Sequence, residues 1–562
     1  MKINKIMFLA LASMLTVGCA DLDTEPQGST VTADQKGQAS EMNPERVSAS
    51  VTGITTMFSV YGSVYGTDNL LHNDFGYPSV MMFLDSRGVD LVGCDVGYNW
   101  FSYGFDLTDR AYTHRCTRMI WGNMYKQIYA ANQVTATIDP ETEDPTLQFY
   151  LAQALAIRAF DYFVLAQCYQ FTYQGNEDAP CVPILTEANA LEAGTNGCAR
   201  NTVKEVYDQI MADLNLAVKM LETTSKTRSD KRYISLDVAY GLRARVELVM
   251  QDWSAAAKDA QAAISASASQ PASIEDVSKP TFKDITENNW MWGILIAETD
   301  RVVTSGIVNW ISHMGSLNYG YASVGAWRRI NPTLYGAINA TDARKGWWLD
   351  ASCKSVNLTA EQQNYLDGKV PETISGALPY TQVKFAPYKD EIYTGTNAND
   401  VPLMRIEEMY LILAEAQAMS GDPGAGKSTL ETFVKTYRDP SYVCYGSSAT
   451  DVQNAVWTQR RIELWGEGME YFDLLRLRKG IDRASTAFKT LDTNMPKYNY
   501  RVADDPAEER AAIAQVKAGN GGSTGKDINV LIFQIPNAET ESNPLINEEN
   551  NNLGAPTLTP IN

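Results

Sequence analysis

The stretch LDVAYGLRARVELVMQDWSAAAKDAQAAI, from Leu236 to Ile264, decides the fold class of this chain. Its small residues recur at helical spacing, which places them on the face where two antiparallel helices touch. A tight turn is expected at Gln251-Asp252. The residues that fit this pattern are Ala244, Asp252, Trp253, Ala256, Ala260 and Ala263. The stretch therefore predicts a helical hairpin of the kind that stacks in tetratricopeptide repeats.

Further periodic segments predict that this hairpin is one of about four. From Met404, small and apolar residues at helical spacing lead to a turn at Gly421-Asp422-Pro423, and a second helix follows through Phe433. Another pair is expected near Gln459. Two earlier helical faces should pack together, namely Ile120, Trp121, Met124, Tyr125 and Ile128, and Leu151, Leu155, Arg158, Tyr162 and Ala166. Because stacked hairpins build one continuous core, we predict a mostly α fold.

Regular periodicity stops between about residues 269 and 400. Gly, Asn and Pro residues there separate short β-like runs such as Trp290 to Ile296. Long irregular segments in compact proteins tend to carry function. We therefore predict a loop-rich insert with short β-strands on the ligand side of the helical scaffold.

The N-terminus predicts a membrane anchor. Two lysines precede an apolar run over residues 6–17, which is typical of a secretory signal and too short to span a bilayer. The run ends at Gly18-Cys19, which resembles a bacterial lipobox, although a plain signal with an incidental cysteine is the alternative. We predict acylation at Cys19 and divide the chain into a lipoprotein signal peptide (1–18), a flexible lipid-anchored tether (19–45) and a single domain (46–562).

Composition predicts a globular protein without nucleic-acid partners. Hydrophobic residues make up 44% and charged residues 20% of the 562 positions, and the formal net charge is −20. A strongly negative chain repels phosphate-rich partners. Beyond Cys19 we expect no membrane-spanning segment, so the lipid is the predicted membrane contact.

Cysteine and histidine positions give no metal motif. Besides Cys19 there are seven cysteines with no CxxC pair, and the three histidines are widely scattered. We predict no structural metal and no cofactor. The spacing leaves open whether Cys181 and Cys198 form a disulfide.

Residues Gly421 to Ser428 match the phosphate-loop pattern GxxxxGK[ST]. A phosphate loop follows a buried strand, but Glu407 to Met419 has helical spacing and helix-forming composition. We therefore interpret Gly426 as a small contact between two helices and Asp422 as a helix cap.

Glu463 and Glu467 lie one helical turn apart, as a glycosidase pair could. Four arginines close in sequence offer ion pairing instead, namely Arg460, Arg461, Arg476 and Arg478. The sequence also has no GxSxG or HExxH motif. We predict no catalytic residues.

The segment QRRIELWGEGMEYFDLLR, Gln459 to Arg476, closely resembles the signature of the SusD/RagB family of surface lipoproteins. Glu470 stands where members usually carry Arg, Leu477 where they often carry Trp, and Glu548-Glu549-Asn550 replaces the usual ending. Other matches, in the family's order, are Cys19 to Pro26, then Trp121, Tyr125, Ile128 and Asn132, then Arg158 to Tyr169, Arg405 to Gln417, Ile535-Pro536, Glu539 and Asn543-Pro544.

This resemblance implies a binding protein rather than an enzyme. It implies a lipoprotein on the outer face of the outer membrane that captures oligosaccharide and delivers it to a SusC-like TonB-dependent transporter. A peptide-binding member of the same importer class is the first alternative. A surface hydrolase and a helical scaffold without a small ligand are the others.

Aromatic residues in aperiodic, glycine-rich stretches are the candidate ligand contacts. Sugars present apolar C–H faces between hydroxyls, so a site needs exposed rings with amides or guanidinium groups nearby. Trp290 and Trp292 alternate along a probable strand and are expected in the core. The predicted ligand residues are Tyr98, Asn99, Trp100 and Tyr103 in one stretch, and Tyr319, Tyr321, Trp327 and Arg328 in another.

Overall fold

The computed structural model describes residues 33–64, 71–93, 100–104, 108–369, 376–479, 481–483, 486–489, 491, 499–500, 532–547 and 551–552. Helices dominate these residues and strands are few and short, which confirms the mostly α fold class. Cys19 and the predicted signal peptide lie outside the described residues.

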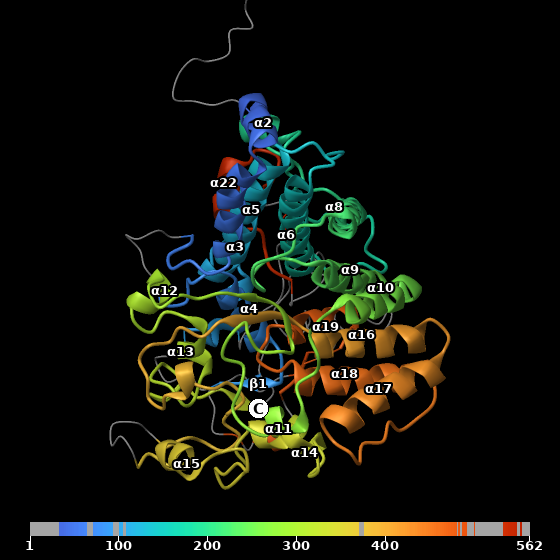
Figure 1. Cartoon of the computed structure of the whole chain (residues 1–562). Coiled ribbons are helices and arrows are strands. Elements are labelled where there is room, and N and C mark those ends of the chain that lie inside the picture. The colour runs from blue at the N-terminus through green and yellow to red at the C-terminus, as the bar shows by residue number, and fades with distance from the viewer. Residues whose placement is uncertain are drawn as a thin grey trace, which may run out of the picture.

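Eight helices form a continuous layer that descends from the top of Figure 1 to its lower right. Each helix packs on the next in chain order from α5 to α17, and α18 packs on both α16 and α17. The layer consists of α5 (Arg115–Thr135), α6 (Pro145–Tyr169), α8 (Val203–Thr223), α9 (Leu236–Met250), α10 (Trp253–Ala266), α16 (Ile406–Met419), α17 (Pro423–Tyr437) and α18 (Ala449–Glu463).

The predicted hairpin at Leu236 to Ile264 is confirmed as α9 and α10. Gln251 ends α9 in the left-handed conformation, with φ of 63°, and Asp252 caps α10 by accepting a hydrogen bond from the N–H of Ala255 at 3.3 Å. Three alanines of α10 are fully buried, namely Ala256, Ala260 and Ala263. Small side chains therefore let the helices of the layer approach closely.

The phosphate-loop pattern lies in the second hairpin, between α16 and α17. Asp422 caps α17 by accepting from the N–H of Ala425 at 2.8 Å. A Cβ atom on Gly426 would lie 2.4 Å from the carbonyl oxygen of Ala414 on α16. The helix before the turn and this close approach confirm that the motif is a helix-helix contact.

Helix α6 is the central helix of the upper part of the molecule. Asp144 caps it by accepting from the N–H groups of Thr146 and Leu147. Among the described residues, α6 alone is long and apolar enough to cross a membrane, but its apolar stretch is completely buried inside the protein. Its composition is thus that of a core helix.

The insert contains several short helices and the strand β2 (Trp290–Ile294), whose partner β4 (Val401–Arg405) directly follows the insert. β2 pairs antiparallel with β4, with Trp290 opposite Arg405. Trp290 and Trp292 are fully buried, which confirms their predicted core position. Two-stranded pairs are also formed by β1 (Leu91–Val92) with β3 (Arg329–Ile330) and by β5 (Ile481–Asp482) with β6 (Asn499–Tyr500).

The remaining helices are short. They are α2 (Ala33–Met42), α3 (Ser48–Thr56), α4 (Tyr77–Arg87), α7 (Ala190–Asn196), α11 (Ile274–Val277), α12 (Arg301–Thr304), α13 (Trp310–Met314), α14 (Pro332–Ala337), α15 (Ala360–Leu366), α19 (Glu470–Arg476), α20 (Thr486–Lys489) and α22 (Asn537–Ser542). In Figure 1, α12 and α13 lie at the left, α11, α14 and α15 at the bottom, α2, α3 and α22 toward the top, and α4 and α19 near the centre. The 3₁₀ helices are η1 (Pro44–Val47), η2 (Ser102–Gly104), η3 (Thr108–Arg110), η4 (Ala343–Trp347) and η5 (Tyr388–Asp390). α2 lies inside the range 19–45 that the sequence predicts as a tether.

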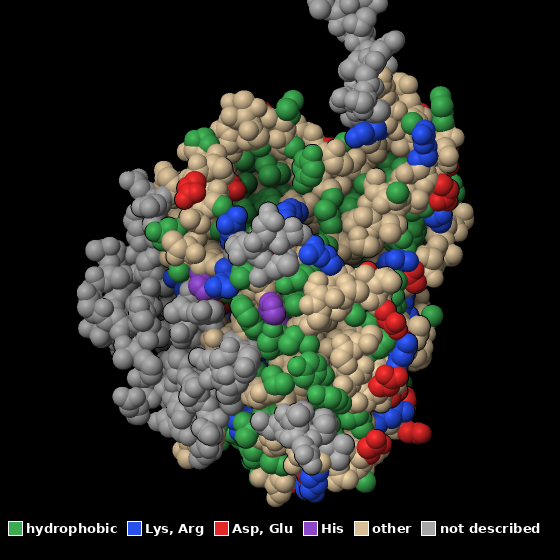
Figure 2. Space-filling view, turned by 90° about the vertical axis from the view of Figure 1, so that its left-hand side faces the viewer, with side chains coloured by type: hydrophobic (Ala, Val, Ile, Leu, Met, Phe, Trp, Pro, Cys, Tyr) green, Lys and Arg blue, Asp and Glu red, His purple; other side chains and the backbone are tan. Residues whose placement is uncertain are grey.

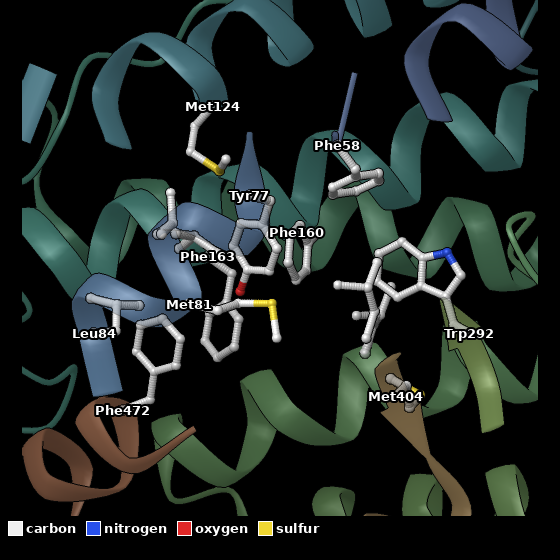
Figure 3. Packing of buried hydrophobic residues seen from close by; sticks show 14 of the residues in the cluster. Phe58, Tyr77, Met81, Leu84, Met124, Phe160, Phe163, Trp292, Met404 and Phe472 are labelled. Atoms are coloured by element: carbon white, nitrogen blue, oxygen red, sulfur yellow. The ribbon is translucent and has the colours of Figure 1, made fainter. Parts of the chain in front are cut away.

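One hydrophobic core joins the helical layer to the insert (Figure 3). Phe58, Phe160 and Trp292 meet edge to face, with ring centroids 5.4 to 5.7 Å apart. They come from the segment after α3, from α6 and from β2. The insert is therefore anchored to the helices by aromatic packing.

Candidate ligand-binding site

The segment Gln459 to Arg476 forms the end of α18, a turn and α19, and its carboxylates lie at a buried junction. Three guanidinium groups donate hydrogen bonds to the Glu463 carboxylate at 2.8 to 3.0 Å, those of Arg344, Arg405 and Arg438. Burial opposes ionisation of Glu463, but these cations hold its pKa well below the ordinary value. Glu463 is thus a permanently charged structural group.

Glu467 completes this charge network. It accepts hydrogen bonds from Arg405 at 2.8 Å and from Lys384 at 2.6 Å. Burial lowers the pKa of Lys384 to about 8 against the opposing effect of Glu467. Ion pairing of the two glutamates is confirmed, but the predicted partners are wrong. The nearby arginines bind elsewhere, Arg460 to Asp473, Arg461 to Asp90, Arg476 to Glu415 and Asp473, and Arg478 to the Gln174 carbonyl.

Glu470 holds the start of α19 against the chain that follows α4. Its Oε1 accepts from the N–H groups of Val89 and Asp90 at 2.6 and 3.0 Å. Burial, together with the Asp90 carboxylate, raises the pKa of Glu470 well above its ordinary value. A Cβ on Gly88 would clash with this carboxyl group. Glu470 therefore serves packing and backbone capping, not substrate chemistry.

Two predicted ligand residues come together around His72. Trp100 stacks on the His72 ring with centroids 5.1 Å apart, and Tyr321 meets the same ring edge to face at 5.9 Å. The His72 Nδ1 and the Tyr321 hydroxyl are also hydrogen-bonded. Asn73 fixes the backbone of Trp100 by donating to its carbonyl oxygen at 2.9 Å. Trp100 and His72 are half-buried, so their rings are partly accessible.

His313 of α13 supports this group from the interior. It stacks on Tyr321 at 4.5 Å and exchanges a hydrogen bond with the carbonyl oxygen of His72 at 2.9 Å. Burial lowers the pKa of His72, and burial with the nearby Arg328 lowers that of His313 still further. Burial raises the pKa of Tyr321 to about 12. All three rings are consequently neutral near pH 7.

A second pair of rings includes Tyr319, which lies two residues before Tyr321 in the chain. Tyr319, 39% exposed, meets Tyr393, 36% exposed, edge to face with centroids 5.4 Å apart. Backbone hydrogen bonds from Tyr319 to Thr394 and from Tyr393 to Leu317 hold the two loops together. We call the residues His72, Trp100, Tyr319, Tyr321 and Tyr393 the aromatic cluster.

The other predicted ligand residues are not part of this accessible surface. Trp327 is 1% exposed and packs in a small core with Leu317, Leu349 and Val383. Arg328 is equally buried and donates to the His313 carbonyl at 3.0 Å. Tyr98 and Asn99 lie outside the described residues, and of Tyr103 only the backbone in η2 is described.

His72 and Tyr393 are the members of the cluster that sequence reasoning missed. His72 lies 249 residues from Tyr321, and Tyr393 lies 74 residues from Tyr319. In the sequence, His72 is one of three scattered histidines, and nothing near it marks it as a ligand contact. Within the described residues, no group of three His, Cys, Asp or Glu side chains could hold a metal ion. The six described cysteines, Cys181 and Cys198 included, are free thiols.

Solved structures with the same fold cover nearly the whole chain. A SusD-like carbohydrate-binding protein from Bacteroides vulgatus is 20% identical, with a TM-score of 0.66 over 90% of this chain and 97% of that one. A SusD superfamily protein from Bacteroides thetaiotaomicron is 17% identical, with a TM-score of 0.67 over 91% and 99%. A laminarin-binding SusD-like protein is 18% identical, with a TM-score of 0.58 over 89% and 98%.

Sequence comparison agrees with the fold. No curated protein matches the chain significantly. A SusD-like family model described as "starch-binding associating with outer membrane" matches residues 97–248, and a model described as "SusD family" matches residues 309–553. The second match contains the whole signature from Gln459 to Arg476, as the sequence predicts. The chain belongs to the SusD/RagB family.

Proposed function

We propose that this protein is a cell-surface lipoprotein that captures oligosaccharide at the aromatic cluster and delivers it to a SusC-like TonB-dependent transporter. The observation that carries the proposal is the half-buried stack of His72 and Trp100, which the buried Tyr321 supports and which the exposed rings of Tyr319 and Tyr393 accompany. Neutral aromatic faces stack on the C–H faces of sugars, and ring nitrogens and hydroxyls of the same residues bond to sugar hydroxyls. The family description as starch-binding and the laminarin-binding relative support a glucan as ligand.

The arrangement also supports binding rather than catalysis. The two carboxylates that the sequence places one turn apart are buried in ion pairs. A general acid needs a carboxyl group that can give up a proton near neutral pH, but the pKa of Glu463 is held far too low. We therefore place glycan turnover outside this protein.

Calorimetry with Trp100→Ala tests the ligand site. We expect the variant to lose about 1 to 3 kcal/mol of binding free energy for starch or laminarin oligosaccharides, the usual cost of removing an aromatic anchor. Tyr445, which is 83% exposed and lies before α18, gives a matched surface control, and Tyr445→Ala should bind normally. Equal binding by parent and Trp100→Ala, or binding of peptides but no glycan, would contradict the proposal.

Cell fractionation of Cys19→Ala tests the anchor. Each buried methylene of a lipid contributes roughly 0.8 kcal/mol to membrane attachment, so loss of the acyl chains should release the protein in cells that lack the transporter. In cells with the transporter, co-purification should persist, because the docking contacts are separate from the lipid. Retention of Cys19→Ala in membranes without the transporter argues against a lipoprotein.

A further inference from the structure

A second pocket shares no lining residue with the aromatic cluster. It has a volume of about 730 Å³, within the usual range of roughly 300 to 1,000 Å³ for small-molecule sites. Its walls come from α5, α7, α22 and the loop before α7. In Figure 2, hydrophobic side chains line a hollow in the upper half of the molecule, where Figure 1 places α5 and α22.

Three aromatic side chains form one wall of this pocket. Trp121, Tyr125 and Tyr129 lie four residues apart on α5, so they share one face at intervals of about 6 Å. The rings of Trp121 and Tyr125 lie 4.7 Å apart. Exposure rises along the stripe, from 6% at Trp121 to 62% at Tyr129. The stripe thus leads from the surface into the pocket.

Small residues of α7 also line the pocket. α7 contributes Ala190, Ala193 and Gly194. A Cβ atom added to Gly194 would meet nothing within 4 Å. The pocket, which we call the slot, therefore combines flat rings from α5 with residues of little side-chain volume from α7.

Most polar groups of the slot are already hydrogen-bonded within the protein. Tyr125 donates to the Pro183 carbonyl at 2.7 Å, and the Trp121 indole donates to Glu539 at 3.3 Å. Asn543 donates to Glu539 and to the Cys198 carbonyl, both at 2.8 Å. A sugar in this slot would leave many hydroxyls without protein partners, which is costly. An apolar body suits these walls better.

Lys126 supplies the one cation in the lining of the slot. Its side chain is exposed, and its Nζ takes part in no hydrogen bond or ion pair within the part of the chain that the structure describes. An ammonium group of this kind binds carboxylates and sulfonates. It lies one residue beyond Tyr125, beside the aromatic stripe.

We propose that this slot binds a small amphipathic anion with a flat aromatic or alicyclic body and one carboxylate or sulfonate group. The body lies between the aromatic stripe of α5 and the small residues of α7, and the anionic group reaches Lys126. This ligand class differs from the glycan proposed for the aromatic cluster. The two proposals therefore succeed or fail separately.

Fluorescence titration with anilinonaphthalene sulfonate, a flat aromatic anion, tests the slot in the full chain carrying Cys19→Ala. Gly194→Phe puts a ring into the open space and should weaken binding at least about tenfold, equivalent to about 1.4 kcal/mol. Gly336, exposed on α14 and equally free of close neighbours, provides the matched control. Gly336→Phe should bind as the parent does.

Charge and location are tested separately. Lys126→Gln should weaken binding of the sulfonate about fivefold and leave binding of neutral 1-aminoanthracene unchanged, since only the ionic contact is lost. In the parent, the sulfonate should slow alkylation of Cys198, which lines the slot, but not of the partly exposed Cys353. Saturating glycan should not displace the dye.

Three results would overturn the proposal. The first is unchanged dye affinity in a folded Gly194→Phe variant. The second is equal loss of the neutral and anionic probes in Lys126→Gln. The third is unaltered Cys198 alkylation at saturating dye, which needs no variant and so remains decisive if Gly194→Phe fails to fold.

Discussion

The charge network around Glu463 and the aromatic cluster around His72 use opposite chemistry. In the network, Glu463 is fully buried and the guanidinium groups that touch it are paired. In the cluster, every ring except that of the buried Tyr321 is partly exposed, and single hydrogen bonds and ring stacking hold the rings of His72, Trp100 and Tyr321. A buried ion pair is costly to break, whereas stacked rings can exchange one apolar partner for another. From this difference we infer that the network holds the fold rigid and that the cluster contacts the ligand.

Breaking the network should give the largest effect on stability. Glu463→Ala leaves three buried guanidinium groups short of a partner, so we expect a loss of about 5 kcal/mol of unfolding free energy, the upper end for a broken buried pair. Urea denaturation measures it. Asp208→Ala, which removes the exposed pair with Lys204 on α8, is the control and should leave the unfolding free energy nearly unchanged. Similar losses of unfolding free energy in the two variants would show that the buried network contributes no more to stability than an exposed ion pair.

Removing a buried tryptophan and a half-buried one, in two separate variants, should sharpen the comparison. Trp327 is buried, so Trp327→Ala leaves a cavity and should cost about 3 to 4 kcal/mol of unfolding free energy. Trp100→Ala should cost far less stability and instead lose glycan affinity. Thermal unfolding and calorimetry on the two variants separate these effects. If Trp327→Ala kept the stability of the parent but bound glycan more weakly, Trp327 would be a ligand residue, as the sequence predicts.

Helical spacing explains why the scaffold could be predicted from the sequence. The alanines of α10 and Gly426 of α17 lie within segments whose period directly reports a buried face. The ion-pair partners could not be predicted, because Arg344, Arg405 and Arg438 approach Glu463 from segments 25 to 119 residues away. The arginines that lie close in sequence therefore led to a correct prediction of ion pairing but to the wrong partners.

Loop aromatics carry much weaker information. Trp100, Tyr321 and Trp327 look alike in the sequence, since each lies in an aperiodic stretch rich in small residues. Their burial depends on which distant loop covers them, and for Trp327 that cover includes Leu349 and Val383. His72 joins the cluster by a contact across 249 residues, for which local sequence has no signal. Composition thus selects candidate rings, while tertiary packing decides which ones a ligand can reach.

Acid should affect the cluster at a higher pH than it affects the network. Burial places the pKa of His313 well below 6.5, so the folded state resists protonation that the unfolded chain accepts. The stability that His313 contributes is complete above pH 6.5 and falls as the pH drops toward its folded pKa, by up to about 1.4 kcal/mol per pH unit. The lowered pKa of Glu463 has its effect only below about 4.5.

A pH series on the parent and His313→Gln isolates this histidine. The charges of Arg328 and of the His72 side chain both act on the His313 pKa, and only Arg328 is charged near pH 7. The rings of Phe75, Phe101 and Tyr321 contact the His313 ring. Other titrating groups, such as Asp85 with a pKa raised to about 7, are common to both proteins and cancel in the difference. At pH 7.5 the parent should be the more stable protein because the stacked ring is lost in the variant. That advantage should shrink between pH 6.5 and 4.5, and a constant difference across this range would show that His313 titrates normally and that the cluster has no acid sensitivity of its own.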